Sequence, residues 1–201
     1  METSRVEAFS DGVFAVAITL LALDLRPGSG STLGRQLLER GAIAHYAAYL
    51  VSFLVIGIIW VNHHSVFRQI ARVDRVLLFI NLLLLLFVAA IPFPTALLAE
   101  HLTEPVDSHP AAFAYSAVMF LMGSSFGVLW WWAVHGGRLL DRPMSRADGK
   151  AALRRFSVGN VAYIALMGLA WVSAPLTLAG HLAVALYYVL DQTPLPRAPS
   201  T

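Results

Sequence analysis

This 201-residue chain has no cysteine and few charged side chains. The absence of cysteine excludes a disulfide framework, a thiolate metal site and a cysteine nucleophile. Charged residues make up 13% of the chain, against the share of about 25% that a soluble domain carries. So few charges cannot build the usual water-exposed surface, and 58% of the residues are hydrophobic. The composition therefore indicates a membrane protein.

Several motifs of familiar functional classes are also missing. The sequence holds no TVGYG-like loop, no apolar stretch with regularly spaced arginines, no phosphate-binding glycine loop and no HExxH. These absences exclude a carbonyl selectivity filter of the usual potassium-channel type and an arginine voltage sensor. The N-terminus carries Glu2, Glu7 and Asp11 against Arg5 alone, without a small-residue cleavage site. We therefore expect no cleaved signal peptide.

What the chain does have is long apolar stretches. A helix needs about 20 apolar residues to cross the hydrocarbon core, and six stretches approach or exceed that length. They run over residues 6–25, 42–67, 76–98, 111–134, 156–173 and 176–190. We predict an all-α, polytopic membrane protein with a six-helix transmembrane domain over 1–192 and a proline-rich, disordered cytoplasmic tail over 193–201. Because the last two stretches are short, a five-span arrangement with these two as one re-entrant pair stays open.

Arginine and lysine indicate the orientation. With the N-terminus inside, the inner segments 1–12, 66–76, 135–156 and the C-terminal tail hold eleven basic residues, and the outer segments hold three. The outer loop over 100–110 has no basic residue and three acidic ones. Basic residues concentrate on the cytoplasmic side of membrane proteins. We therefore expect both termini in the cytoplasm of a multi-pass protein of the cell membrane. Pro92 and Pro94 should kink the third span.

The first span combines an aliphatic stripe with polar residues. At about 100° per residue, Val16, Leu20 and Leu23 fall within about 60° of one another on a helix, and Thr19 flanks them. Ser10 and Asp11 lie just inside the bilayer, where an ionisable group is costly and often functional. An alternative is that these two residues cap the helix while the stripe faces lipid or a neighbouring helix.

The second span ends in the sequence Trp-Val-Asn-His-His, which includes His63 and His64. Adjacent histidines point about 100° apart on a helix, so they cannot bind one metal as an i, i+4 pair could. We expect one of them to hydrogen-bond the polar residues of the first span and the other to face an interface or water. Asn81 and Asn160 are isolated polar residues in later spans and are expected to be interhelical hydrogen-bond partners. Gly123 and Gly127 form a GxxxG pattern, which predicts close helix packing.

These residues resemble the signature of the transmembrane protein 175 family of potassium channels. The pattern Arg-x-x-x-Phe-Ser-Asp is present as Arg5, Phe9, Ser10 and Asp11. The stretch Trp-x-x-His-His-x-x-Phe over 60–67 and the following Arg-x-Asp are also similar to the family. The likeness is strongest over residues 5–98.

The resemblance implies a homotetramer in the lipid bilayer whose first helices line a central pore for potassium ions. It implies that the pore is narrowest at rings of large aliphatic side chains, which correspond here to Val16, Leu20 and Leu23, with Thr19 associated with selectivity. It also implies a structural polar network under the pore, whose candidate members are listed here: Arg5, Phe9, Ser10, Asp11, His63 and His64. Position 16 is usually isoleucine in the family, so valine would widen the constriction by one methylene.

Two other functional classes stay open from the residues alone. A secondary or proton-coupled transporter would need an occluded polar site near mid-membrane, but the residues at that depth are mostly aliphatic. A membrane-embedded enzyme would need a nucleophile and base that converge, and the sequence does not identify such a pair. We therefore expect no catalytic residue, no cofactor, no resident metal and no nucleic-acid partner.

Overall fold

The computed structural model of the chain is a bundle of long α-helices. It describes residues 2–26, 28, 32–135, 139–141 and 146–190, and the tail expected to be disordered over 193–201 lies outside these described residues. Within them, one isolated β-bridge joins Ile70 to Leu140, and the regular elements are otherwise helical. This confirms the predicted all-α class.

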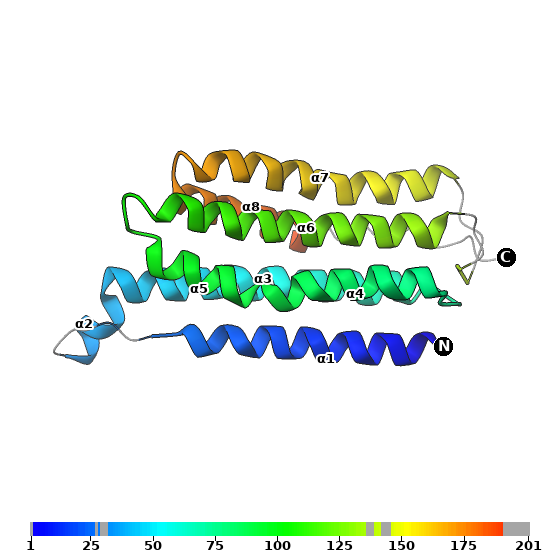
Figure 1. Ribbon diagram of the computed structural model, residues 1–201, viewed down its shortest axis with the longest axis horizontal. Helices are drawn as coiled ribbons and strands as arrows, with labels where there is room; N and C mark the ends of the chain where they lie inside the picture. The colour runs from blue at the N-terminus through cyan, green and yellow to red at the C-terminus, as the bar shows by residue number, and fades with distance from the viewer. Residues whose placement is uncertain (1, 27, 29–31, 136–138, 142–145, 191–201) are drawn as a thin grey trace.

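The helices match the predicted apolar stretches closely. Their bounds are α1 Thr3–Leu21 with the 3-10 turn η1 Ala22–Asp24, α2 Leu33–Leu38, α3 Arg40–Phe67, α4 Arg75–Ala90, α5 Pro92–His101, α6 Ser108–Val134, α7 Arg146–Ala170 and α8 Ala174–Leu190. The long helices run side by side in alternating directions (Figure 1). Four helical segments of the described chain are long and apolar enough to span a membrane, and two shorter apolar helices follow at 157–170 and 174–189.

The two prolines of the third span interrupt it as expected. The helix ends at Ala90 and resumes at Pro92, with prolines in the first turn of α5. Proline has no backbone N–H and its ring clashes with the preceding turn, so a continuous helical ladder cannot pass through it. The N–H of Ile91 instead bonds the carbonyl of Val88 at 3.2 Å. The predicted kink is therefore confirmed as a break between α4 and α5.

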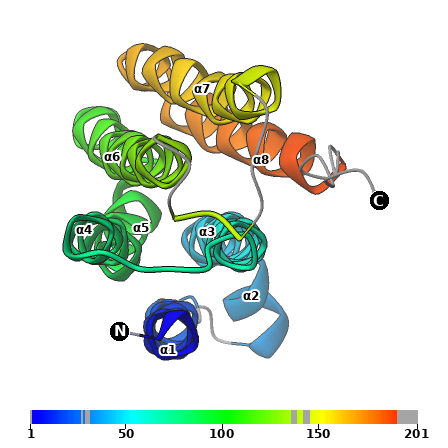
Figure 2. The ribbon, with the colours of Figure 1, turned by 90° about the vertical axis from the view of Figure 1, so that its right-hand side faces the viewer.

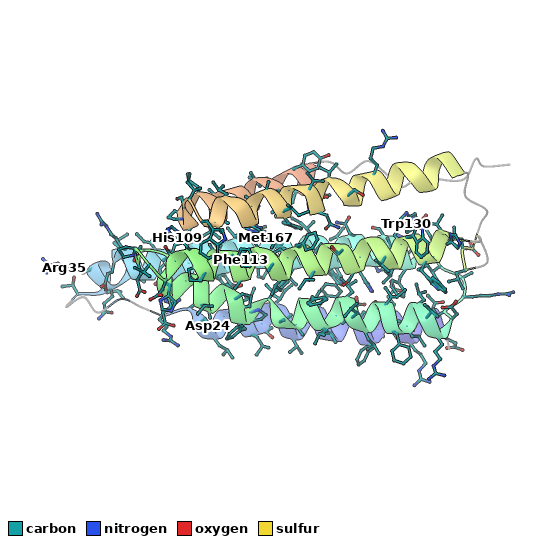
Figure 3. The ribbon with its side chains drawn as sticks, turned by 45° about the horizontal axis from the view of Figure 1, so that its top comes forward. Asp24, Arg35, His109, Phe113, Trp130 and Met167 are labelled. Atoms are coloured by element: carbon teal, nitrogen blue, oxygen red, sulfur yellow. The ribbon has the colours of Figure 1, made fainter. Side chains whose placement is uncertain are left out.

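Three segments that the sequence places on the inner side meet at one end of the bundle. The N–H of Ala71 donates to the carbonyl of Leu139 at 2.8 Å, and the N–H of Asp141 donates to the backbone carbonyl of Gln69 at 2.9 Å. The hydroxyl of Thr3, at the start of α1, lies 3.4 Å from the carbonyl of Ala71. Asp24, Arg35 and His109 lie toward the opposite end (Figure 3). The alternation of sides expected along the chain is therefore present in the structure.

The core places α1 at the edge of the bundle. Helix α6 packs against α4, α5 and α7, and its Trp130 and Tyr115 are among the largest fully buried side chains. Helix α1 packs against α3, α4 and α5 and lies at the side away from α7 (Figure 2). As a result, one face of α1 is covered by the chain itself and the other is open.

The GxxxG pattern acts through one of its two glycines. A Cβ added at Gly123 would lie 2.5 Å from Asn160 Oδ1 of α7, whereas one added at Gly127 would meet nothing within 4 Å. The prediction of close packing is therefore confirmed at Gly123 and wrong within this chain at Gly127. Asn160 also lies 3.4 Å from the Ser124 hydroxyl, which confirms it as an interhelical partner.

Candidate functional site

Helix α1 has two faces of different character. Its buried side chains are Val6, Ser10, Phe14, Ala17 and Leu21, which recur at intervals of three or four residues. This spacing puts them on one side of a helix. They pack inward against α3 and α4. Packing inside the chain therefore determines which face of α1 points outward.

The aliphatic stripe of Val16, Leu20 and Leu23 lies on the open face. The three side chains are 57%, 40% and 75% exposed in the single chain. Thr19 is exposed beside them, and its hydroxyl donates to the carbonyl of Val16 at 2.9 Å. Leu23 lies in the 3-10 turn η1, so its side chain points in a somewhat different direction than it would in a continued α-helix. It is still exposed on the open side. Ser10 and the aliphatic stripe therefore fall on different faces of the first span.

A buried polar chain connects α1 to two other helices. Asn81 of α4 donates from Nδ2 to the Ser10 hydroxyl at 3.0 Å, and Asn81 Oδ1 lies 2.9 Å from His63 Nε2 of α3. Because the amide oxygen is an acceptor, His63 Nε2 carries the proton in this arrangement. The Ser10 hydroxyl in turn donates to the carbonyl of Val6 at 2.8 Å. The chain Ser10–Asn81–His63 thus pairs the Ser10 hydroxyl, the Asn81 amide and the Nε2 of His63 inside an apolar core, where an unpaired group would be costly. Among the described residues, Nδ1 of His63 has no hydrogen-bond partner.

Aromatic rings hold His63 in place. Its ring stacks on Phe67 with centroids 4.3 Å apart and lies 5.4 Å from the ring of Phe14. His63 is completely buried. Of the two adjacent histidines, His63 is therefore the one that connects to Ser10, and it does so through Asn81.

Two further pairs join the exposed edges of α1 and α3. The indole Nε1 of Trp60 donates to Asp11 Oδ1 at 2.8 Å, and His64 Nδ1 lies 2.6 Å from Glu7 Oε1. Glu7 and Asp11 are four residues apart on α1, and Trp60 and His64 are four residues apart on α3. Because the helices are antiparallel, the two pairs lie one turn apart along the same contact. We call these two pairs the edge pairs.

The remaining signature residues do not join either group within the chain. Arg5 and Phe9 are exposed, and so is Gly12. A Cβ added at Gly12 would meet nothing within 4 Å, so this glycine makes no close helix contact within the described single chain. Arg5, Phe9 and Gly12 share the open face of α1 with the aliphatic stripe.

Comparison with known proteins places this arrangement in a family. Residues 5–92 match the family described as the endosomal/lysosomal potassium channel TMEM175. A potassium channel of Streptomyces collinus is 53% identical over 196 residues, which cover 97% of this chain and 95% of that protein. The chain belongs to the TMEM175 family.

A further relative and a solved structure match nearly the whole length of the chain. A potassium channel of Chamaesiphon minutus is 36% identical over 192 residues, which cover 94% of each protein. The crystal structure of a lysosomal potassium-selective channel TMEM175 homologue from the same organism has a TM-score of 0.83 at 35% identity and covers 95% of this chain and 98% of that one. The TMEM175 fold therefore extends beyond the matched residues 5–92 to include α6, α7 and α8.

Some contacts of the TMEM175 signature region were not foreseen. Asn81 was expected to be an interhelical partner, which is confirmed, but the sequence did not name Ser10 and His63 as its partners. The bond from Trp60 to Asp11 and the pair of Glu7 with His64 were also not predicted. The i, i+4 spacing of an acidic pair on α1 and of an aromatic–histidine pair on α3 is the signal that could have revealed the edge pairs.

Proposed function

We propose that this protein is a potassium-selective channel that conducts passively through a central pore lined by α1 from four identical copies. The observation that carries the proposal is the aliphatic stripe of α1, which lies open on a helix whose opposite face is held to the bundle. The names of its full-length relatives as potassium channels support the permeant ion. Neither a catalytic residue nor a cofactor is part of the proposal.

The polar contacts of α1 support its role as a pore helix. Ser10 is bonded to α4 through Asn81, and Asp11 is bonded to α3 through Trp60. Two bonds to two different helices set the rotation of α1 about its own axis. Four copies would therefore present the same residues to a shared axis, as a ring of equivalent side chains requires.

The aliphatic stripe would form a constriction without oxygen ligands. Val16 and Leu23 are seven residues apart, or about 10 Å along the helix, so the narrow region would occupy about a third of the hydrocarbon core. A ring of apolar side chains that is too narrow for a hydrated ion favours the cation that loses water more easily, which is potassium rather than sodium. Such a ring can also close by dewetting.

Two side chains would tune this constriction. Val16 is one methylene smaller than isoleucine, so the ring at this level is wide and its selectivity modest. The Thr19 hydroxyl donates to the carbonyl of Val16, and its oxygen keeps a lone pair that can face the pore. We assign Thr19 a part in selectivity for this reason.

The proposed assembly is a homotetramer in the cell membrane with both termini in the cytoplasm. The excess of basic residues in the predicted inner segments supports this orientation. The inner segments that meet near Thr3 and Ala71 would then lie on the cytoplasmic side. The edge pairs would lie near the cytoplasmic mouth of the pore, below the aliphatic stripe.

Ion flux from proteoliposomes tests the proposal. Purified protein is reconstituted, and flux is followed under potassium, caesium and sodium gradients for the wild type, Val16→Ala and Leu20→Ala. We expect passive flux that favours potassium, and a lower potassium-to-sodium ratio in both variants because the ring widens. Val161→Ala is the matched control, since Val161 is 66% exposed on α7, and it should leave the ratio unchanged.

Two results would contradict the proposal. Flux that saturates and requires a coupled counter-gradient would indicate a transporter. An unchanged ratio in both Val16→Ala and Leu20→Ala would mean that the aliphatic stripe faces lipid and does not line the ion path.

A further inference from the structure

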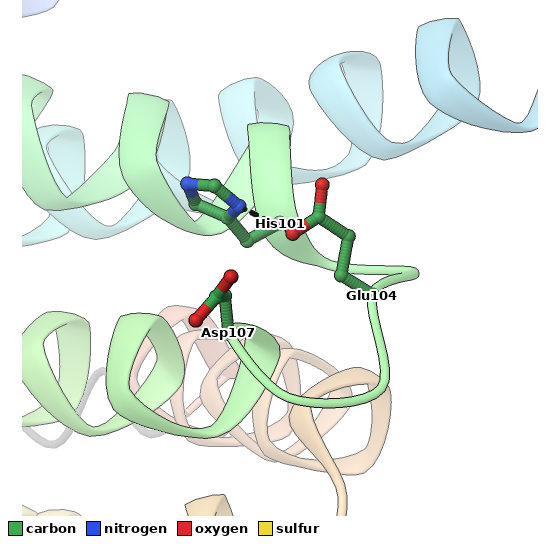
Figure 4. A group of neighbouring side chains, drawn as sticks. All are labelled: His101, Glu104 and Asp107. Carbon is green, nitrogen blue, oxygen red and sulfur yellow. Dashed lines mark hydrogen bonds and ion pairs between the residues drawn. The ribbon is translucent and has the colours of Figure 1, made fainter.

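The corner between α5 and α6 brings three metal-ligating side chains together. His101 is the last residue of α5, Asp107 is the N-cap of α6, and Glu104 lies in the short loop between them. Figure 4 shows the three side chains converging on one point from the two helix ends and the loop. This corner lies away from the polar contacts of α1, and it is on the outer side in the proposed orientation.

We propose that His101, Glu104 and Asp107 bind one divalent cation of the zinc class. One ligand atom from each side chain lies within 4.8 Å of the other two, and His101 Nδ1 lies 2.7 Å from Glu104 Oε2. Three atoms bound to one zinc ion at about 2.0–2.2 Å in tetrahedral geometry are about 3.5 Å apart. Glu104 and Asp107 are exposed and His101 is partly exposed, so small side-chain rotations suffice to bring all three onto one ion.

The backbone of the corner holds the ligands in place. The N–H of Glu104 donates to the carbonyl of His101 at 2.9 Å, and the N–H of Ala111 donates to the carbonyl of Asp107 at 3.2 Å. The first bond closes the turn after α5, and the second starts the helical ladder of α6. A cation at this corner would therefore bridge the end of one helix and the start of the next.

The side chain of Asp107 does not do what its position usually requires. An aspartate at the N-cap normally accepts a hydrogen bond from an N–H of the first helical turn, but Asp107 makes no such side-chain bond. Its carboxylate is directed toward His101 instead (Figure 4). The helix thus forgoes a stabilising cap, and the carboxylate is available to a ligand at the corner.

The ligand set favours zinc over calcium. One imidazole nitrogen and two carboxylates suit zinc, cobalt or nickel, and a water molecule would complete four-coordination. Calcium takes six to eight oxygen ligands, more than two carboxylates provide. The loop over 100–110 has no lysine or arginine, and Glu100 adds a further negative charge nearby. The local potential therefore attracts a divalent cation.

Calorimetric titration of ZnCl2 into tag-free protein in detergent tests the site. Calcium at ~1 mM is present throughout, so that it occupies weak, nonspecific sites among the acidic surface residues. We expect one zinc ion per chain. Glu104→Gln and Asp107→Asn should each weaken binding about tenfold or more. Glu100→Gln is the matched control, because it removes the same charge from the last turn of α5, next to the cluster but outside it. Because it removes only a longer-range attraction and no ligand atom, it should weaken binding far less than Glu104→Gln or Asp107→Asn.

The unfolding temperature of each variant is measured alongside the titration. In EDTA, Glu104→Gln and Asp107→Asn should unfold at the same temperature as the wild type. Lowering the pH should weaken zinc binding in the wild type, because the imidazole must be deprotonated to ligate. The proposal is overturned if the wild type shows no saturable zinc binding. It is also overturned if Glu104→Gln and Asp107→Asn bind like the wild type, or if Glu100→Gln loses affinity to the same extent. In either of these two cases, His101 and Glu104 would form an ion pair without a metal site. This test does not depend on whether the protein conducts ions.

Discussion

The Ser10 hydroxyl of α1 accepts a hydrogen bond of 3.0 Å from the amide of Asn81 on α4. Both side chains are buried, and the same amide bonds His63 of α3 on its other side. One asparagine therefore joins three helices, and it holds the covered face of α1 while the aliphatic stripe points outward. The orientation of the proposed pore helix depends on this contact.

Replacement of Asn81 should destabilise the protein. In Asn81→Ala, the Nε2–H of His63 loses its acceptor inside the core, and a cavity replaces the amide. An unsatisfied buried group costs about 1–3 kcal/mol. The unfolding midpoint measured in detergent by intrinsic fluorescence should therefore fall on the order of 5–10 °C.

Asn160→Ala provides the control for Asn81→Ala. Asn160 is half-buried, and its bond to Ser124 is long at 3.4 Å, so the midpoint should fall clearly less. If both variants lose the same stability, the buried polar chain has no special role in holding α1.

The bond between Asp11 and Trp60 should matter for assembly more than for conduction. In Asp11→Ala, α1 loses one of its two edge pairs with α3, so the rotation that four copies must share is less tightly fixed. A hydrogen bond to a charged group contributes about 1.5–3 kcal/mol. We expect less tetramer than in the wild type, both on cross-linking in membranes and on size-exclusion chromatography of the detergent-solubilised protein. The two samples should contain equal amounts of protein.

Trp60→Phe should reproduce the effect of Asp11→Ala, because phenylalanine keeps an aromatic ring but has no indole N–H. Trp131→Phe is the control, since Trp131 is exposed near the end of α6, and it should assemble normally. Normal assembly of Asp11→Ala together with lost potassium flux would show instead that the carboxylate contacts the ion path.

A glycine in α7 should be intolerant of alanine because of α8. A Cβ added at Gly159 would lie 2.6 Å from the hydroxyl oxygen of Tyr188 and 3.2–3.3 Å from two of its ring carbons. The ring must move or the helices must separate, which costs about 1–3 kcal/mol. The unfolding midpoint of Gly159→Ala should fall accordingly.

Gly168→Ala lies on the same helix, and its added Cβ would meet nothing within 4 Å. Alanine is the better helix former by about 1 kcal/mol, so this control should be neutral or slightly stabilising. Equal effects of the two substitutions would mean that α7 and α8 pack less closely than the structure shows.

Some features of this protein follow from the sequence alone. The hydrocarbon core requires long apolar helices, so the apolar stretches, the break at Pro92 and the all-α class were predictable from local composition. The aliphatic stripe was also predictable, because Val16, Leu20 and Leu23 repeat with the period of one helix. The count of basic residues predicts the orientation in the same local way.

Only the tertiary structure decided which residues meet across helices. His63 rather than His64 joins Ser10, because the rotation of α3 turns one histidine inward and leaves the other at the edge beside Glu7. Asn81 bridges Ser10 and His63 because the register of α4 puts its amide at the same depth in the bundle as these two side chains. The turn after α5 likewise directs His101 and Asp107 toward one point. Helix rotation, register and turn geometry depend on packing among distant segments, and a periodic pattern within one segment carries no information about its neighbours.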